Sequence, residues 1–205
     1  MRSVSGLVVA GGTSTRLGTD KRVVRLAGIT LLDRAVDILT AMSDDVMVAA
    51  RDAVRVPDGV RVVPDPLPDR GPMAGILAGL RHARRARLLV IPVDMPMLTP
   101  SFLRFLVDVD PDAAVTVPRW QPGLEPLVAV YHKVCAAALT ELVEHGTTAI
   151  HAFINSTGLQ VHRVDEPELR AHGDPAQLFL NINTPEDLTL AETLLAGPRP
   201  SDAPR

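Results

Sequence analysis

Short runs of consecutive apolar residues alternate with amphipathic segments along the first part of the chain. A run that is apolar at every position is typical of a strand covered on both faces. Such runs predict strands at residues 6–10, 46–50, 60–63, 88–92 and 113–117. Between them, apolar residues at helical spacing predict helices at residues 31–42, 73–85 and 100–107. Thr30 and Thr99 stand where the side chain can cap the first and third of these helices.

The pattern becomes less regular after about residue 118. It predicts further strands at residues 124–130, 160–164 and 178–182, and helices at residues 132–144, 147–155 and 185–195. Thr184 is placed to cap the last helix. The alternation of strands and helices in the first half predicts an α/β fold with a doubly wound, mostly parallel, Rossmann-like sheet and right-handed crossovers.

The composition fits a single folded domain and narrows the range of partners. Of the 205 residues, 46% are hydrophobic and 22% are charged, which is enough to bury a sizeable core. A formal net charge of −3 and an aromatic content of 3% give no drive toward nucleic acid. No apolar run approaches the ~20 residues that span a bilayer, and the N-terminal run is too short for a signal peptide. With one cysteine, Cys135, and hence no internal disulfide, we expect a cytoplasmic protein without a nucleic-acid or membrane partner.

A glycine-rich loop begins at the end of the first predicted strand and runs from Ala10 to Lys21. Backbone N–H groups of such a loop can approach a phosphate closely. The Walker A pattern is absent, because no Gly-Lys-Ser/Thr follows Gly12 at the required spacing, and the adjacent glycines do not fit G-x-G-x-x-G. Arg16 and Lys21 add a planar fork and a point charge, which suits a triphosphate. The alternative is a solvated basic loop with turn glycines.

Two aspartates follow predicted strands directly. Asp94 comes after the strand at residues 88–92, and Asp65 after the strand at residues 60–63. Since ligands of open α/β sheets bind beyond the carboxyl ends of the strands, both loops should open onto one crevice with the glycine-rich loop. A carboxylate at the position of Asp94 can hold Mg²⁺ against triphosphate oxygens. Alternatively, Asp94 caps a turn or helix and Asp65 bonds its own backbone.

The second half carries fewer candidates. On the predicted strand at residues 178–182, Asn181 and Asn183 would point to the same side of the strand end and present amide groups to a metal or a phosphate. They could instead satisfy loop backbone. Glu125 stands at the entrance of the strand at residues 124–130, either as a functional carboxylate or as a solvated strand end.

Four separate motifs resemble those of the molybdenum cofactor guanylyltransferases, the MobA-like branch of the sugar-nucleotide pyrophosphorylase superfamily. They are the loop at residues 9–21, the Asp65 to Gly79 stretch with Gly-Pro-Met-Ala-Gly-Ile, the Pro-Val-Asp-Met-Pro around Asp94, and Asn-Ile-Asn-Thr-Pro-Glu-Asp-Leu at residues 181–188. The chain departs from the family pattern with Val9 for Leu, Leu17 for Met and Val93 for Cys. It also lacks a polar residue after its second strand, which leaves base recognition open.

The resemblance implies a fold of the nucleotidyltransferase type and transfer of GMP from GTP to molybdopterin, with release of pyrophosphate. It implies one domain over residues 1–196, with a nucleotide-binding half to about residue 118 and an acceptor-binding half from about residue 119. The sequence of residues 197–205, Gly-Pro-Arg-Pro-Ser-Asp-Ala-Pro-Arg, predicts a disordered tail. The metal would be Mg²⁺, held by Asp94, and transient contacts with molybdenum-insertion proteins or apo-molybdoenzymes are implied as well.

The residues that match the family motifs fall into three groups. The catalytic residues would be Arg16, Lys21 and Asp94. The GTP-binding residues would be Val9, Ala10, Gly11, Gly12, Lys21, Asp65 and Asp94. The candidates for the acceptor side, or for supporting it, are Glu125, Asn181 and Asn183.

Two other functions remain open at this point. The loop motifs contact phosphates rather than a base, so a related transferase that uses CTP or a sugar phosphate has the same signature. A non-catalytic nucleotide-binding module on this fold is the other alternative. Loss of Lys21 or Asp94 would be the mark of such a module, and both are present.

Overall fold

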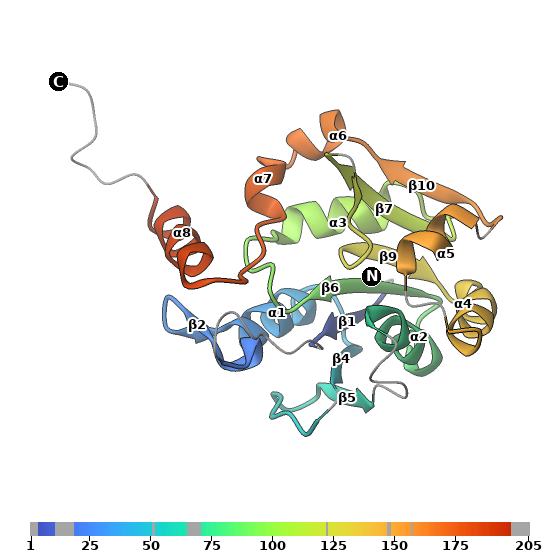
Figure 1. Ribbon diagram of the computed structural model, residues 1–205, viewed down its shortest axis with the longest axis horizontal. Coiled ribbons are helices and arrows are strands. Elements are labelled where there is room, and N and C mark those ends of the chain that lie inside the picture. The colour runs from blue at the N-terminus through green and yellow to red at the C-terminus, as the bar shows by residue number, and fades with distance from the viewer. Residues whose placement is uncertain are drawn as a thin grey trace.

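The computed structural model describes residues 4–10, 19–50, 52–64, 71–121, 123–146, 149–156 and 158–197. Its centre is a twisted sheet with the strand order β10-β7-β9-β6-β1-β4-β5 (Figure 1). The bounds of these strands are β1 (Ser5–Val9), β4 (Val46–Ala50), β5 (Arg61–Pro64), β6 (Arg87–Pro92), β7 (Val115–Trp120), β9 (Ala129–His132) and β10 (Val161–Val164). A short strand, β8 (Gly123–Leu124), pairs with the end of β7.

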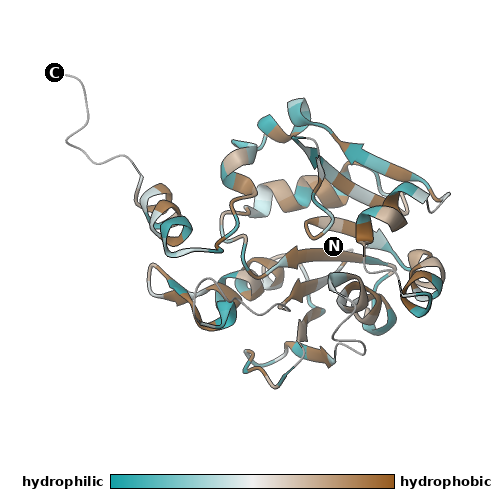
Figure 2. Cartoon of the chain, in the orientation of Figure 1, coloured by the Kyte–Doolittle hydropathy of each residue, from teal (hydrophilic) through white to brown (hydrophobic). Residues whose placement is uncertain are grey.

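Helices cover both faces of the sheet. They are α1 (Leu31–Thr40), α2 (Pro72–His82), α3 (Pro100–Asp108), α4 (Cys135–Glu144), α5 (Ile150–Ser156), α6 (Glu166–Arg170), α7 (Pro175–Leu178) and α8 (Pro185–Ala196). Successive residues of β1 point to opposite sides: Val8 packs in the core with α1 and α3, and Leu7 in the core with α2, α4 and α5. This two-sided burial explains why the central strands are apolar at every position, as Figure 2 shows for β1 and β6.

The predicted fold class is confirmed, with one reversal of direction in the sheet. Strands β5, β4, β1 and β6 are parallel, and β10 is parallel to β7. Strand β9 is antiparallel to both β6 and β7. The strand predicted at residues 124–130 was wrong in its extent, because this stretch contains the end of β8 and the start of β9. A turn at Pro126 and Leu127 separates β8 from β9, because proline cannot donate to a strand ladder.

The strand predicted at residues 178–182 was wrong. Asp174 caps a short helix, α7, which has Pro175 at its first position, and the Asp174 carboxylate accepts a hydrogen bond from the Ala176 N–H. The chain then continues without regular structure, and the Ile182 N–H donates to the Asp94 carbonyl at 2.8 Å. The apolar residues of this stretch are buried as an irregular segment, so an apolar run alone did not identify a strand.

Several other boundaries follow from local chemistry. Thr30, Thr99 and Thr184 cap α1, α3 and α8 as predicted. The helix predicted at residues 147–155 is α5, although Thr147 and Thr148 lie outside the described residues. The structure adds a 3-10 turn, η1 (Lys21–Val23), and a hairpin of β2 (Arg25–Leu26) and β3 (Ile29–Thr30) before α1. Of the predicted tail, only Gly197 is described. No helix in the described part of the chain is long and apolar enough to cross a membrane.

Candidate functional site

Three predicted site residues from distant parts of the chain meet beyond the carboxyl ends of β1 and β6. The Lys21 ammonium lies 2.7 Å from Oδ2 of Asp94 and 2.6 Å from Oδ1 of Asn183. Lys21 and Asn183 are 162 positions apart in the sequence. The side chains of Lys21 and Asp94 are 16% and 20% exposed, so the pair is shielded from water but still reachable.

The turn η1 sets the position of Lys21. Asp20 caps this turn by accepting a hydrogen bond from the Arg22 N–H at 2.9 Å. The Arg22 guanidinium also bonds both oxygens of Asp20, and this hydrogen bonding holds the pKa of the Asp20 carboxyl below its usual value of 3.8. One residue after η1, the Val24 carbonyl accepts from the Leu31 N–H at the start of α1. Lys21 therefore projects from a turn that is anchored to a core helix.

The sheet and the segment before α8 hold Asp94 in place. The Val93 N–H donates to the Val9 carbonyl at 3.2 Å, which continues the pairing of β1 with β6 one step beyond the strands. The Asp94 carbonyl accepts from the Ile182 N–H at 2.8 Å. Backbone hydrogen bonds on both sides therefore fix the position of Asp94. Its carboxylate oxygen Oδ2 accepts a hydrogen bond from Lys21.

Asn183 is positioned by the start of α8. The Asp187 carboxylate accepts from the Asn183 N–H at 2.9 Å and from the Thr184 N–H at 2.8 Å. The Thr184 hydroxyl in turn accepts from the Asp187 N–H at 3.2 Å, which completes a capping box. Burial raises the pKa of Asp187, but these backbone hydrogen bonds and the charge of Lys21 outweigh it and leave the pKa below 3.8. The Thr-Pro-Glu-Asp pattern at residues 184–187 is a capping signal, from which this role of Asp187 could have been predicted.

The other predicted residues stand at different distances from this group. Val9 and Ala10 are buried at the end of β1, and the Ala10 N–H donates to the Ala49 carbonyl at 3.0 Å. Gly11, Gly12, Arg16 and Asp65 lie outside the described residues. Within the described part of the chain, no hydrogen bond joins Glu125 or Asn181 to Lys21, Asp94 or Asn183.

Glu125 lies in the turn between β8 and β9. Its N–H donates to the Pro118 carbonyl, and its own carbonyl accepts from the Val128 N–H, both at 2.9 Å. Burial raises the pKa of the Glu125 carboxyl. The Glu125 side chain is half-buried, so its carboxylate is partly desolvated and is held by a tight turn.

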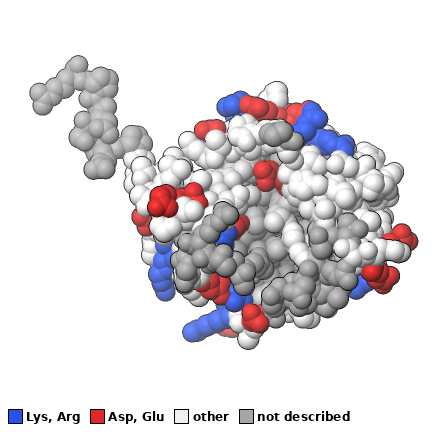
Figure 3. Space-filling model, viewed as in Figure 1, with Lys and Arg blue, Asp and Glu red and all other residues white. Residues whose placement is uncertain are grey.

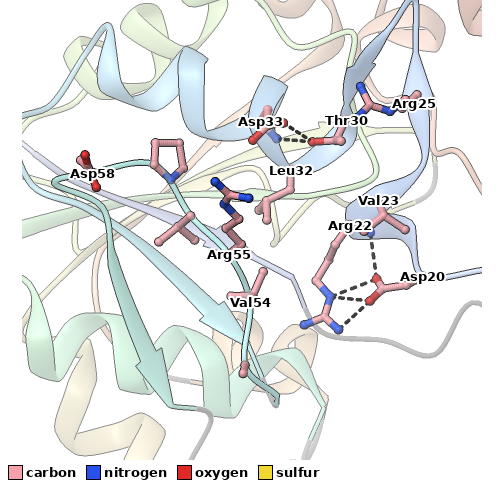
Figure 4. A pocket seen from close by; sticks show the side chains of 13 residues that line it. Asp20, Arg22, Val23, Arg25, Thr30, Leu32, Asp33, Val54, Arg55 and Asp58 are labelled. Atoms are coloured by element: carbon pink, nitrogen blue, oxygen red, sulfur yellow. Dashed lines mark hydrogen bonds and ion pairs between the residues drawn. The ribbon is translucent and has the colours of Figure 1, made fainter.

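A groove of about 650 Å³ opens beside η1. It is lined by η1, the start of α1 and the segment at residues 53–58, and Figure 4 shows the Asp20–Arg22 pair at one end of it with Arg55 at its centre. Figure 3 shows blue and red side chains interspersed around the rim of the drawn face. The groove therefore offers charges of both signs next to Lys21 rather than a surface of one sign.

The Asp94 carboxylate suits a magnesium ion. One of its oxygens contacts a positive charge in the structure, the Lys21 ammonium. Mg²⁺ prefers oxygen ligands and is usually bound through one or two carboxylates together with substrate phosphates. Among the described residues, no cluster of three or more His, Cys, Asp or Glu side chains could hold a metal alone. A site with one carboxylate therefore fits a metal that arrives with phosphate.

At the carboxyl edge of a largely parallel sheet, the Lys21 ammonium can bind nucleotide phosphates directly, and Asp94 can reach them through a bridging cation. The fold and this edge define the class of α/β nucleotidyltransferases. The chain belongs to the family of the MobA-like NTP transferase domain, whose model matches residues 6–162. The family resemblance inferred from the four motifs is thereby confirmed.

Curated relatives and solved structures agree with this family. A probable molybdenum cofactor guanylyltransferase of Chloroflexus aggregans is 37% identical over 94% of this chain and 95% of its own length. Its counterpart in Pelotomaculum thermopropionicum is 32% identical over 97% of both. The crystal structure of molybdopterin-guanine dinucleotide biosynthesis protein A from Archaeoglobus fulgidus is 26% identical, has a TM-score of 0.79, and covers 94% of this chain and 99% of that one. A Thermus thermophilus cytidylyltransferase, 19% identical with a TM-score of 0.73 over 95% and 98%, shares the fold.

Proposed function

We propose that this protein transfers GMP from GTP to the terminal phosphate of molybdopterin and releases pyrophosphate. The observation that carries the proposal is the convergence of Lys21, Asp94 and Asn183 beyond the ends of β1 and β6. The names of the relatives support GTP and molybdopterin as the two substrates. The motif matches support Val9, Ala10, Gly11, Gly12 and Asp65 as further GTP-binding residues.

The reaction forms a bond between an acceptor phosphate oxygen and the α-phosphorus of GTP, and it breaks the bond between that phosphorus and the bridging oxygen of pyrophosphate. The acceptor is already an anion, so no strong general base is required. The main tasks are to align the two phosphates and to neutralise the charge that develops on the leaving group. Lys21 serves the second task as a point charge, and Arg16 supplies a second cation.

Mg²⁺ fits this chemistry as the resident metal, because it polarises phosphate oxygens when it is bound. Asp94 would hold it. In the structure the Asp94 carboxylate is paired with Lys21. With metal and GTP bound, Asp94 would hold the metal and Lys21 would contact the phosphates. Asn183 remains available to Lys21 after that exchange, because its amide oxygen contacts the ammonium independently of Asp94.

The acceptor side and the surroundings of the protein belong to the same proposal. We place molybdopterin toward the second half of the chain, with Glu125, Asn181 and Asn183 as the residues that contact or support it. Residues up to about 118 then form the nucleotide-binding half and residues 119–196 the acceptor-binding half of one domain. We place the protein in the cytoplasm, in transient contact with molybdenum-insertion proteins or apo-molybdoenzymes.

The test measures pyrophosphate release from GTP with molybdopterin and Mg²⁺, for the parent protein and for Asp94→Asn. Removal of one charge-stabilising group commonly costs about 10²–10³ in rate, so we expect a loss of that size. The control is Asp108→Asn, which alters an exposed aspartate at the end of α3. Parent-like turnover by Asp94→Asn would show that the metal and catalytic assignments are wrong.

A second measurement separates the proposal from the two alternatives. The thermal stability of the parent protein is compared with GTP, CTP, UTP and ATP in the presence of Mg²⁺. A ligand present at 100 times its Kd stabilises a protein by about 2.7 kcal/mol, which such a scan resolves. Stabilisation by CTP alone would show that the nucleotide substrate is CTP and not GTP. Stabilisation by GTP without pyrophosphate release would favour a nucleotide-binding module.

A further inference from the structure

The start of α8 carries one more hydrogen bond than a helix cap requires. In a capping box, the side chain at the third helical position bonds the N–H of the cap residue, and Asp187 does this to Thr184 at 2.8 Å. Asp187 also accepts from the N–H of Asn183, which lies outside the helix, at 2.9 Å. The same oxygen, Oδ2, takes both bonds. The second bond does not serve the helix, so it fixes the backbone of Asn183.

The segment that contains Asn183 is fixed at its other end as well. The Ile182 N–H donates to the Asp94 carbonyl at 2.8 Å, and the Ile182 side chain is fully buried. Asn183 therefore lies between an attachment to the β6 loop and an attachment to α8. Its side chain then has a defined origin from which the amide oxygen reaches Lys21 at 2.6 Å.

Lys21 needs such a partner because its side chain is long and flexible. An ammonium on a flexible four-carbon stem has many rotamers, so it points in one direction only where neighbours fix it. In the structure two oxygens do so, from Asp94 and Asn183. If Asp94 held the metal, the Asn183 amide oxygen would still orient the ammonium.

From these contacts we propose that Asp187 is a positioning residue of the transferase, which acts through Asn183 to direct the Lys21 ammonium at the phosphates. The inference rests on the proposed function of Lys21. Asp187 itself touches neither substrate nor metal in this proposal.

A purely structural role as a helix cap is the competing explanation, and α8 offers a matched control for it. Glu186 is the other acid in the first turn of α8, and it is exposed. Glu186→Ala removes the same helix-dipole interaction without touching Asn183. Comparison of Glu186→Ala with Asp187→Ala therefore separates a general effect on the helix from an effect on the site.

The experiment measures GMP transfer and thermal unfolding for Asp187→Ala, Asp187→Asn and Glu186→Ala, with Lys21→Ala as the reference. Misplacement of a group by about 1 Å can cost about 10²-fold in rate, so we expect Asp187→Ala to lose ~10–100-fold in turnover while it remains folded. Asp187→Asn should recover most of the loss, since an amide oxygen can still accept both backbone bonds. Glu186→Ala should keep the parent turnover.

A double-mutant cycle adds a measurement that a structural role would not affect. If Asp187 acts through Asn183, Asn183→Ala combined with Asp187→Ala should be no slower than Asn183→Ala alone. If the turnover losses of Asn183→Ala and Asp187→Ala multiply in the double variant, the inference is overturned. Parent-like turnover by Asp187→Ala, with slow turnover by Lys21→Ala, would overturn it as well. In both cases the proposed function stands. Parent-like turnover by Lys21→Ala would remove Lys21 from the proposed function and this inference with it.

Discussion

Asp45 lies at the amino edge of the sheet, opposite the candidate site, and replacing it tests how the fold is held together. Its side chain is 2% exposed and sits just before β4. The carboxylate accepts hydrogen bonds from the Ser5 hydroxyl at 2.5 Å, the Arg84 N–H at 2.8 Å and the Arg61 guanidinium at 2.5 Å. One carboxylate thus links β1, the loop after α2, and β5.

The magnitude for Asp45→Ala follows from these partners. Removing one member of a buried ion pair costs about 3–5 kcal/mol. Arg61 is 33% exposed and can regain water, which reduces its share. The Ser5 hydroxyl, fully buried, and the Arg84 N–H would lose their acceptor, at about 1–3 kcal/mol each. We therefore expect a loss of about 3–5 kcal/mol in the free energy of unfolding, which lowers Tm by roughly 6–20 °C in a chain of this length.

Urea denaturation and thermal unfolding measure this loss, with Asp44→Ala as the neighbouring control. Asp44 bonds Arg85 at 3.0 Å, and both side chains are about half exposed at 49% and 44%. Exposed ion pairs contribute up to about 1 kcal/mol, so the control should change stability little. Equal losses in the two variants, or a loss under about 1 kcal/mol for Asp45→Ala, would refute the reasoning.

The stability difference between the parent and Asp45→Asn, measured as a function of pH, is a second test of the role of Asp45. Burial opposes ionisation of Asp45, but the hydrogen bonds from Ser5, Arg84 and Arg61 prevail and hold the pKa of its carboxyl below 3.8. A lowered folded-state pKa contributes stability that is present above the unfolded-state pKa and is lost as the pH falls through the folded-state pKa. The stability advantage of the parent over Asp45→Asn should therefore be full at neutral pH and shrink below about pH 4.

Three shorter predictions concern packing, a thiol and the acceptor side. A Cβ at Gly79 would lie 2.6 Å from the Leu7 side chain, so Gly79→Ala should lose about 1–3 kcal/mol in urea unfolding, whereas Gly75→Ala has room and should gain up to about 1 kcal/mol. Burial raises the pKa of Cys135 to about 12, so a thiol reagent should modify the native protein far more slowly than the unfolded protein. Burial raises the pKa of Glu125, so its negative charge destabilises the folded protein at neutral pH. Glu125→Gln should therefore raise Tm increasingly above about pH 5, and it should reduce GMP transfer. A lower Tm would contradict this prediction.

The sequence was most informative where structure is local. The central strands were predicted because burial on both faces removes polar residues from β1, β4 and β6, and the caps because Thr30, Thr99 and Thr184 bond backbone groups three residues away. The direction of β9 could not be read in the same way. Its pairing with β6 and β7 is a contact between distant segments, and an apolar strand has the same sequence whether it runs parallel or antiparallel.

In the candidate site, too, the positions set by local structure were predicted and those set by contacts between distant segments were not. Asp94 could be placed at the carboxyl edge, since a residue just after a buried parallel strand must lie there. Asn183 was predicted from the family motif at residues 181–188 and from a strand at residues 178–182, and that strand was wrong. Its contact with Lys21 arises instead from an irregular segment that is fixed by Asp94 at one end and by Asp187 at the other.

That difference bears on how the site works. A residue on a strand is positioned by the sheet and tolerates changes in its neighbours, whereas Asn183 depends on two individual hydrogen bonds, to the carbonyl of Asp94 through Ile182 and to the carboxylate of Asp187. The part of the site that contacts Lys21 is therefore only as rigid as those bonds. It follows that the Asn-Thr-Pro-Glu-Asp sequence combines a helix cap with the support of a functional side chain, and that its acidic residue at position 187 should tolerate replacement by asparagine but not by alanine.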